Sequence, residues 1–248
     1  MTTFKERLMN GECLIGPMVT LNSPEAIEVL TMVGFDWLFI DAEHGAFSTL
    51  DMQRLIQTAG AAMPCLIRVA AGEEVAIKKA LDIGAAGIIV PQVNRVDQTE
   101  DIIRWACYAP QGGRGVGIGR AHGYGLHFND YIERANAEVT VVIQAEHIEA
   151  VNNIEAIVQV QGVDAVLIGP YDLSASMGLI GQVDHPEVIA AIDRVTIACR
   201  TAGKPLGIFG VTAEAVKPYI DQGYTLITAG LDIMLMAQAA KSLLNALR

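Results

Sequence analysis

Short apolar segments alternate with amphipathic helical segments along the whole chain. Eight such apolar segments can be counted: LIGPMV (14–19), DWLFIDAEH (36–44), PCLIRV (64–69), GIIVPQV (87–93), VTVVIQAEH (139–147), DAVLIGP (164–170), KPLGIFG (204–210) and YTLITAG (224–230). Repeated strand–helix units are typical of a parallel sheet, and eight of them can close into a barrel. We therefore predict an α/β fold, a single (β/α)₈ TIM barrel that occupies residues 1–248 as one domain.

Composition and charge exclude several other classes of protein. The 248 residues are 52% hydrophobic, enough for one large core. A net charge of −11 predicts no nucleic-acid partner, because phosphate binding needs clustered Lys and Arg. The charged N-terminal segment lacks the apolar core expected of a signal peptide, and no run of about 18 apolar residues predicts a membrane span. The four cysteines show neither disulfide nor zinc-site spacing, so we expect a cytoplasmic protein with reduced thiols.

One connection is much longer than the others. Residues 109–128, APQGGRGVGIGRAHGYGLHF, are rich in glycine and include Arg114, Arg120, His122 and His127. The segment lacks the GK[ST] ending of a phosphate-binding loop. A long connection in a compact domain is usually functional or disordered. Since it follows the fourth strand, we expect it on the active-site face, as a lid or a wall of the substrate site.

Polar residues stand where the apolar segments end, which is where barrel enzymes keep their chemistry. They come from five different segments: Asp41, Glu43 and His44; Arg68; Gln92; Gln144 and Glu146; and, directly after the sixth, Tyr171 and Asp172. Any one of them has a purely structural reading, such as a solvent-facing strand end, a helix cap or an internal ion pair. Their joint occurrence at the same end of a barrel predicts an active site.

Glu146 and Asp172 are the predicted metal ligands. Gln144 and Glu146 are two residues apart and project to the same side of a strand, whereas His147 points to the other side. A Glu and an Asp without Cys form an oxygen-rich site, which suits Mg²⁺, Mn²⁺ or Co²⁺ better than tetrahedral zinc. A 2-oxo acid could complete the coordination of such an ion and be polarised by it.

The other polar residues fit the chemistry of a 2-oxo acid. Arg68 would neutralise a developing oxyanion, and His44 would accept a proton near neutral pH. Backbone N–H groups at Tyr171 and Asp172 could hold the carboxylate of the substrate. An imine-forming aldolase needs a lysine in the barrel mouth, but the lysines fall on helices or at the start of the seventh strand. This placement favours a metal-dependent reaction.

At these residues the sequence resembles the class II pyruvate aldolases of the HpcH/HpaI family, which act on 4-hydroxy-2-oxoheptanedioate or 2-dehydro-3-deoxyglucarate. The resemblance covers nearly the whole chain and is carried by IDAEH (40–44), IRV (67–69), IIVPQV (88–93), YAPQGGRGVG (108–117), QAE (144–146) and IGPYDLSASMG (168–178). It implies a metal on Glu146 and Asp172, and pyruvate bound through Arg68, Gln144, Tyr171 and Asp172. It also implies a hexamer, with His44 as the base or its relay. Asp41 or Asp82 would tune His44, and Asp82 would reach it from a neighbouring subunit.

The sequence leaves the exact reaction open. The leading hypothesis is reversible cleavage of a 4-hydroxy-2-oxo acid to pyruvate, or a close 2-oxo acid such as hydroxypyruvate, and an aldehyde. Alternatives are an oxaloacetate-type decarboxylase, an acyl-CoA thioester lyase on the same barrel, and a binding module without turnover. Gln144-Ala145-Glu146-His147 and the loop RAHGYGLHF depart from the family pattern, so the aldehyde is not identified.

Overall fold

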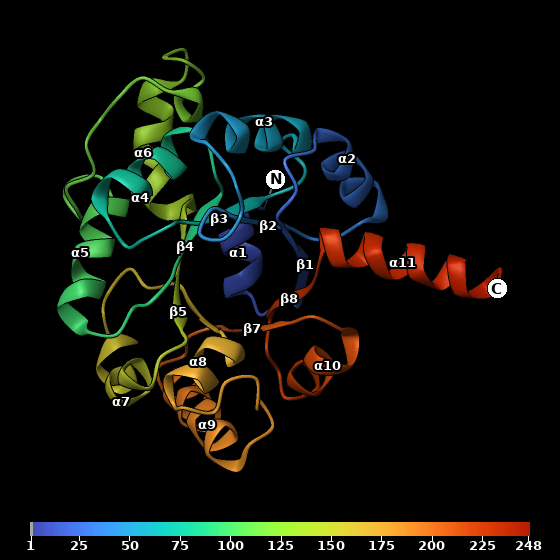
Figure 1. Ribbon diagram of the computed structural model, residues 1–248. Coiled ribbons are helices and arrows are strands. Elements are labelled where there is room, and N and C mark those ends of the chain that lie inside the picture. Colours follow the sequence, from blue (N-terminus) through green and yellow to red (C-terminus); the bar gives the residue numbers. More distant parts are fainter. Residues whose placement is uncertain (1) are drawn as a thin grey trace.

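The eight predicted strands form a closed parallel barrel. The structure, a computed structural model, describes residues 2–248, and each strand pairs with its neighbours in chain order until β8 closes on β1 (Figure 1). The strands are β1 (Leu14–Val19), β2 (Leu38–Asp41), β3 (Cys65–Arg68), β4 (Gly87–Val90), β5 (Thr140–Ala145), β6 (Ala165–Ile168), β7 (Leu206–Gly210) and β8 (Leu226–Leu231). The predicted fold class is therefore confirmed.

Helices surround the barrel and connect its strands. They are α1 (Phe4–Met9), α2 (Pro24–Val33), α3 (Thr49–Ala59), α4 (Glu74–Asp82), α5 (Val96–Ala106), the 3₁₀ turn η1 (Arg120–His122), α6 (Phe128–Glu138), α7 (Ile148–Ile157), α8 (Pro170–Ser176), α9 (Pro186–Thr201), α10 (Ala213–Asp221) and α11 (Asp232–Ala246). Helix α2 begins with a cap that its sequence supplies, because the Ser23 hydroxyl accepts the Ala26 N–H and Pro24 takes the first helical position.

Two apolar clusters hold the barrel together. The larger lies between the strands and the surrounding helices, and includes Ile40, Ile67 and Ile143. The smaller fills the barrel interior with strand residues such as Phe39 and Leu167. Phe4 and Leu8 of α1 belong to this inner cluster, so α1 closes the end of the barrel where the strands begin. The other end, where the strands finish, stays open for a site.

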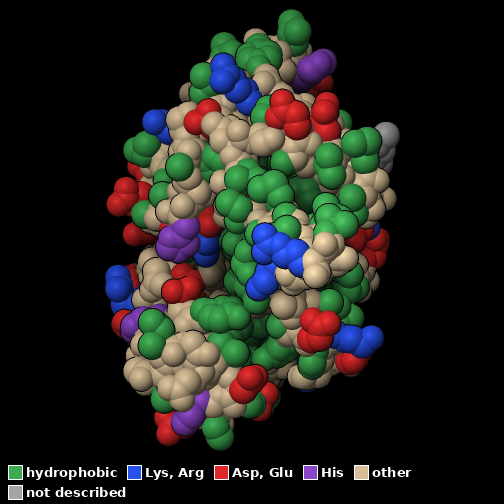
Figure 2. Space-filling view, turned by 45° about the vertical axis from the view of Figure 1, so that its right-hand side comes forward, with side chains coloured by type: hydrophobic (Ala, Val, Ile, Leu, Met, Phe, Trp, Pro, Cys, Tyr) green, Lys and Arg blue, Asp and Glu red, His purple; other side chains and the backbone are tan. Residues whose placement is uncertain are grey.

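Helix α11 departs from this arrangement. It extends away from the barrel (Figure 1), and Asp232 at its start is its buried residue, whereas Met236 and Leu243 are exposed. Figure 2, in which the side carrying α11 comes forward, shows hydrophobic side chains gathered in the middle of that face. No described helix, α11 included, combines the length and the apolar character needed to cross a membrane.

Several predicted strands are shorter in the structure. The strand predicted over 36–44 pairs over Leu38–Asp41, and the one predicted over 139–147 ends at Ala145. After Asp41 the chain turns, because the Asp41 carboxylate accepts the N–H groups of Glu43 and His44 at 3.1 and 3.4 Å. Glu43, His44 and Glu146 therefore lie in turns just beyond the strands.

The prediction for the long connection was wrong about its position. Residues 109–128 follow α5, so they lead back to the end of the barrel where β5 begins. There the Arg120 guanidinium donates to the Ile83 carbonyl at 3.1 Å, and Arg114 contacts Asp82 at the end of α4. The segment thus lies at the opposite end from the strand-end polar residues and cannot be a wall of the site in its own chain.

Candidate functional site

A hollow of about 340 Å³ lies at the end of the barrel where the strands finish. Six of the predicted site residues line it: Asp41, His44, Arg68, Gln144, Tyr171 and Asp172. The remaining wall is mainly apolar and includes Met18, Phe39, Leu167, Phe209, Leu231 and Met234. Strands from around the barrel thus bring together residues that are up to 131 positions apart in the sequence, Asp41 and Asp172 being the outermost of the six.

Arg68, the last residue of β3, is the electrostatic centre of the hollow. Its Nε and Nη2 donate to the two oxygens of Asp41 at 2.8 Å each, and its Nη1 lies 3.2 Å from a Glu43 oxygen. The side chain also lies over the Phe39 ring. Burial opposes the charge of this guanidinium, but the hydrogen bonds and charges of Asp41, with those of Glu43 and Glu146, outweigh burial and raise its pKa.

Glu43 was named from the sequence among the polar residues at the strand ends, but no role was predicted for it. Its carboxylate contacts both Arg68 and, at 3.8 Å, the His44 imidazole. Partial burial raises its pKa, and the charges of Asp41 and Asp172 act in the same direction against Arg68 and His44. Alternation along a strand could not identify this contact, because Glu43 lies in the turn after β2.

Glu146 lies just behind the lining of the hollow and is 2% exposed. One of its oxygens accepts the Gln92 backbone N–H at 2.8 Å and the Gln92 side-chain amide at 3.1 Å, and the other accepts from the Gln144 amide. Burial raises the Glu146 pKa to about 7, and the neighbouring charges of Asp172 and Glu43 add to the rise against the Gln92 hydrogen bond and Arg68. A buried carboxylate in this state would be stabilised as an anion by a nearby cation.

Gln92, which donates to Glu146, has an unusual backbone conformation. It has a φ of 54°, in the left-handed region that residues other than glycine seldom adopt. In that conformation both its N–H and its side chain reach Glu146, while its carbonyl accepts from Gln98 at 2.9 Å. The sequence placed Gln92 near the site but offered no signal for this conformation.

The residues around Glu146 fit a hard divalent cation. The side-chain Oε1 of Gln144 is buried without a hydrogen-bond partner, and Asp172 lies close enough to Glu146 for its charge to raise the Glu146 pKa. A Cβ at Gly169 would stand 3.1 Å from a Glu146 oxygen, so glycine keeps this space open. Among the described residues no group of three or more His, Cys, Asp and Glu could hold a metal. Two carboxylates that leave positions for water and substrate oxygens remain a suitable set for Mg²⁺ or Mn²⁺.

The two histidines beside these carboxylates differ in role. The His44 imidazole is largely exposed at the hollow, with Glu43 as its carboxylate neighbour, whereas Asp41 contacts only the His44 backbone N–H. His147 points elsewhere, as predicted, and its Nδ1 accepts the Glu149 N–H at 3.1 Å to begin α7. Of these two imidazoles, that of His44 therefore lines the hollow.

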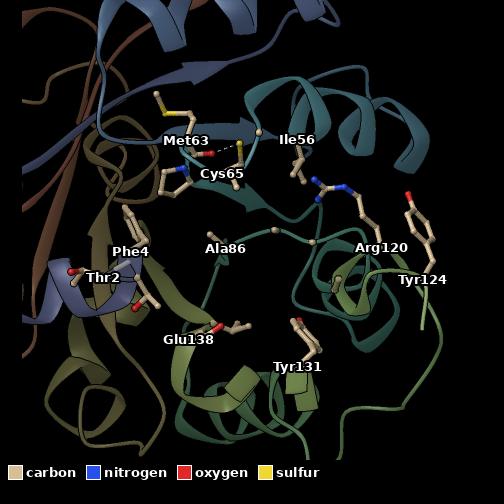
Figure 3. A pocket seen from close by; sticks show the side chains of 18 residues that line it. Thr2, Phe4, Ile56, Met63, Cys65, Ala86, Arg120, Tyr124, Tyr131 and Glu138 are labelled. Carbon is tan, nitrogen blue, oxygen red and sulfur yellow. Dashed lines mark hydrogen bonds between the residues drawn. The ribbon is translucent and has the colours of Figure 1, made fainter. Parts of the chain in front are cut away.

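Asp82 is not brought to the hollow. It ends α4 at the opposite end of the barrel, where its carboxylate accepts from the Arg114 guanidinium at 2.7 Å. Near it is a second hollow of about 630 Å³, in which Arg120 extends toward Ile56 (Figure 3). Within one chain the predicted catalytic residues thus divide into a group at the mouth and Asp82 at the far end.

Comparison with known proteins agrees with this geometry. The family described as HpcH/HpaI aldolase/citrate lyase matches residues 15–239. The hydroxypyruvate/pyruvate aldolase of Roseobacter denitrificans is 35% identical over 98% of this chain and 96% of its own. The 4-hydroxy-2-oxo-heptane-1,7-dioate aldolase of Shigella sonnei is 37% identical over 97% and 93%. The crystal structure of a family protein from Burkholderia cenocepacia J2315 superposes with a TM-score of 0.96, at 34% identity over 100% of both chains.

Proposed function

Because the chain belongs to the HpcH/HpaI aldolase/citrate lyase family and is a carbon–carbon lyase, we propose that it cleaves a 4-hydroxy-2-oxo acid reversibly into a 2-oxo acid and an aldehyde. The 2-oxo acid would be pyruvate or a close relative such as hydroxypyruvate. The observation that carries this proposal is the position of Glu146 behind the hollow that Arg68, Gln144 and Asp172 line. The names of both relatives support it.

Glu146 and Asp172 would hold a divalent cation, Mg²⁺, Mn²⁺ or Co²⁺. When bound, such an ion supplies Lewis-acid stabilisation of negative charge on the 2-oxo group. Gln144 is suited to orient the substrate, because its unpartnered Oε1 is buried at the hollow. The backbone at Tyr171 and Asp172, in the first turn of α8, would bind the substrate carboxylate.

The cleavage itself would use His44 and Arg68. His44 would accept the proton of the C4 hydroxyl, the C3–C4 electron pair would pass to C3 as the aldehyde leaves, and Arg68 would stabilise the resulting enolate oxygen. Protonation of C3 then releases the 2-oxo acid. Asp41 and Glu43 would support this step indirectly, because they hold the Arg68 guanidinium in place from two sides.

We further propose a homo-oligomer, a hexamer as the family resemblance implies. Exposed apolar residues along α11, among them Met236 and Leu243, support this, because packing against another copy would bury them. In such an assembly Asp82 could approach the His44 of a neighbouring copy. Sedimentation at several protein concentrations measures the assembly, and a monomer at micromolar concentration would contradict this part of the proposal.

Pyruvate release from a panel of 4-hydroxy-2-oxo acids, coupled to lactate dehydrogenase, tests the reaction. After stripping with EDTA, we expect activity to disappear and to return with Mg²⁺, Mn²⁺ or Co²⁺. Glu146→Gln should lower kcat/KM by about 1,000-fold or more, since a charged ligand is lost. Glu149→Gln, an exposed position in the first turn of α7, is the matched control and should have no effect.

Three results would favour another function. Much faster loss of CO₂ from oxaloacetate than release of pyruvate from any aldol would favour the decarboxylase. Cleavage only of coenzyme A thioesters would favour the thioester lyase. Binding of 2-oxo acids without turnover, whichever metal is added, would favour the binding module.

A further inference from the structure

The hollow is asymmetric, with a charged side and an apolar side. The charged residues, with Gln144 and Tyr171, come from β2, β3, β5, α8 and the turn after β2, whereas the side formed by β7, β8 and the start of α11 contributes Phe209, Val211, Leu231 and Met234. Met18 of β1 continues this apolar side. Thr20, which follows β1, also lines the hollow, and its hydroxyl donates to Asp232 at 2.8 Å. Since the charged side would hold the 2-oxo acid, the apolar side is the part of the hollow left for the aldehyde.

The side chains in and around the hollow carry a net negative charge. Of the described residues that line it, Arg68 alone carries a permanent positive charge, and Asp41 and Glu43 already contact its three guanidinium nitrogens. Asp172 lies in the lining and Glu146 just behind it. In the proposed reaction Arg68 and the cation on Glu146 and Asp172 are already engaged by the 2-oxo acid. A second carboxylate on the aldehyde would therefore meet apolar carbon, and it would lose hydration without gaining a cationic side chain of this chain.

We propose that the acceptor aldehyde of this enzyme is uncharged and has a short apolar chain. This inference rests on the proposed aldol reaction and names its second substrate class. Methylene groups placed against Phe209, Leu231 and Met234 would be removed from water, so each should improve kcat/KM until the hollow is full. An acidic semialdehyde should be a poor substrate for the same reason that an isolated charge is poorly buried.

Butanal and succinic semialdehyde are the matched pair that tests this, because both have four carbons and differ by the terminal carboxylate. Initial rates of 4-hydroxy-2-oxo acid formation from pyruvate would be followed by chromatography, with the metal that supports most activity. We expect kcat/KM to favour butanal by about 100-fold. From ethanal to butanal it should rise about threefold per added carbon. Equal rates, or a preference for the semialdehyde, would overturn the inference and would indicate a cation supplied by a neighbouring copy.

A positive charge introduced on the apolar side of the hollow gives a second test. Val211→Arg places a cation on the apolar side, and we expect it to reduce the preference for butanal at least tenfold, mainly through a lower KM for succinic semialdehyde. Val75→Arg adds the same charge at an exposed position on α4 and should leave the preference unchanged. If Val211→Arg does not fold, Met234→Arg tests the same wall from α11. The comparison of aldehydes with the wild-type enzyme tests the inference without any variant.

One measurement separates failure of this inference from failure of the aldol proposal. Exchange of the pyruvate methyl protons with deuterium in D₂O requires proton removal at that carbon but no aldehyde. Absence of exchange with every metal would refute the aldol reaction, and the acceptor class would fall with it. Exchange combined with a preference for the semialdehyde would refute only the acceptor class.

Discussion

Two buried arginines, one at each end of the barrel, contact a carboxylate at nearly the same distance but have different surroundings. Arg68 donates to Asp41 at 2.8 Å, contacts Glu43 as well and lines the hollow at the mouth. Arg114 donates to Asp82 at 2.7 Å and lies over the rings of Tyr108 and Tyr131, 4.5 and 5.8 Å from their centroids. In both, burial opposes the charge while neighbouring groups raise the pKa.

The two arginines differ in the charge around them and in the open space beside them. At the mouth, four carboxylates, those of Asp41, Glu43, Glu146 and Asp172, lie in or beside a hollow that holds one guanidinium, which leaves an excess of negative side-chain charge beside open space. At the far end one guanidinium meets one carboxylate, and the rings of Tyr108 and Tyr131 pack against that guanidinium. Unbalanced charge beside a cavity is suited to a cation and a substrate, whereas a balanced pair packed among rings is suited to holding a loop.

Arg68→Lys should have the largest effect of three substitutions that probe this comparison. A lysine cannot donate to both oxygens of Asp41 and still contact Glu43, so the cation should leave its position beside the substrate. We expect kcat/KM for aldol cleavage to fall by about 1,000-fold. Arg104→Lys, on the exposed face of α5, is the control. Activity within tenfold of the wild type would show that the mouth arginine is structural, like its counterpart.

Arg114→Met should act on stability instead. The variant keeps much of the stem but loses the charge-assisted hydrogen bond to Asp82 and the contacts of the guanidinium with both tyrosines, so the free energy of unfolding should fall by about 2 kcal/mol. Urea unfolding measures it, with Arg104→Met as the control. Activity per folded molecule should fall far less than in Arg68→Lys. A loss as large would mean that the Asp82 end also serves the site of a neighbouring copy.

Substitution of His122, which lies near Asp82 at the far end of the barrel, should give the smallest effect. We expect it to change how the stability of the protein depends on pH. Its buried imidazole accepts the Gly119 N–H and contacts the Tyr108 hydroxyl, and burial, with the charge of Arg114, lowers its pKa. Because the folded pKa lies below the ordinary value of about 6.5, the stabilisation is complete above that pH and is lost as the pH falls below it. We expect a loss of about 1 kcal/mol, the scale of one hydrogen bond.

Melting temperatures between pH 5 and pH 8 would measure this loss. His122→Gln should flatten the pH profile relative to the wild type, whereas His127→Gln, at an exposed position of the same segment, should leave its slope unchanged. A wild-type profile as flat as that of His122→Gln would contradict the contribution assigned to the imidazole.

Much of the site at the mouth was predictable because strand alternation and strand order are local properties. A residue at the end of a parallel strand must lie at one end of the barrel, so Arg68, Gln144 and Asp172 could be placed together before any distance was known. The contact of Glu43 with Arg68 was not predicted, because Glu43 lies in a turn, and a turn has no period from which its direction follows. The long connection was misplaced because its position depends on whether it precedes or follows a helix, and α5 precedes it.

The sequence by itself determined the barrel, the order of its strands and the set of polar residues at its mouth, because hydrophobic periodicity and residue chemistry are properties of short segments. Only the tertiary structure decided which charges are balanced. That balance depends on distances between segments far apart in the chain: Glu146 meets Gln92, Arg68 lies between Asp41 and Glu43, and Met234 of α11 completes an apolar wall. Electrostatic energy and burial vary with such distances, and no pattern within a single segment contains them.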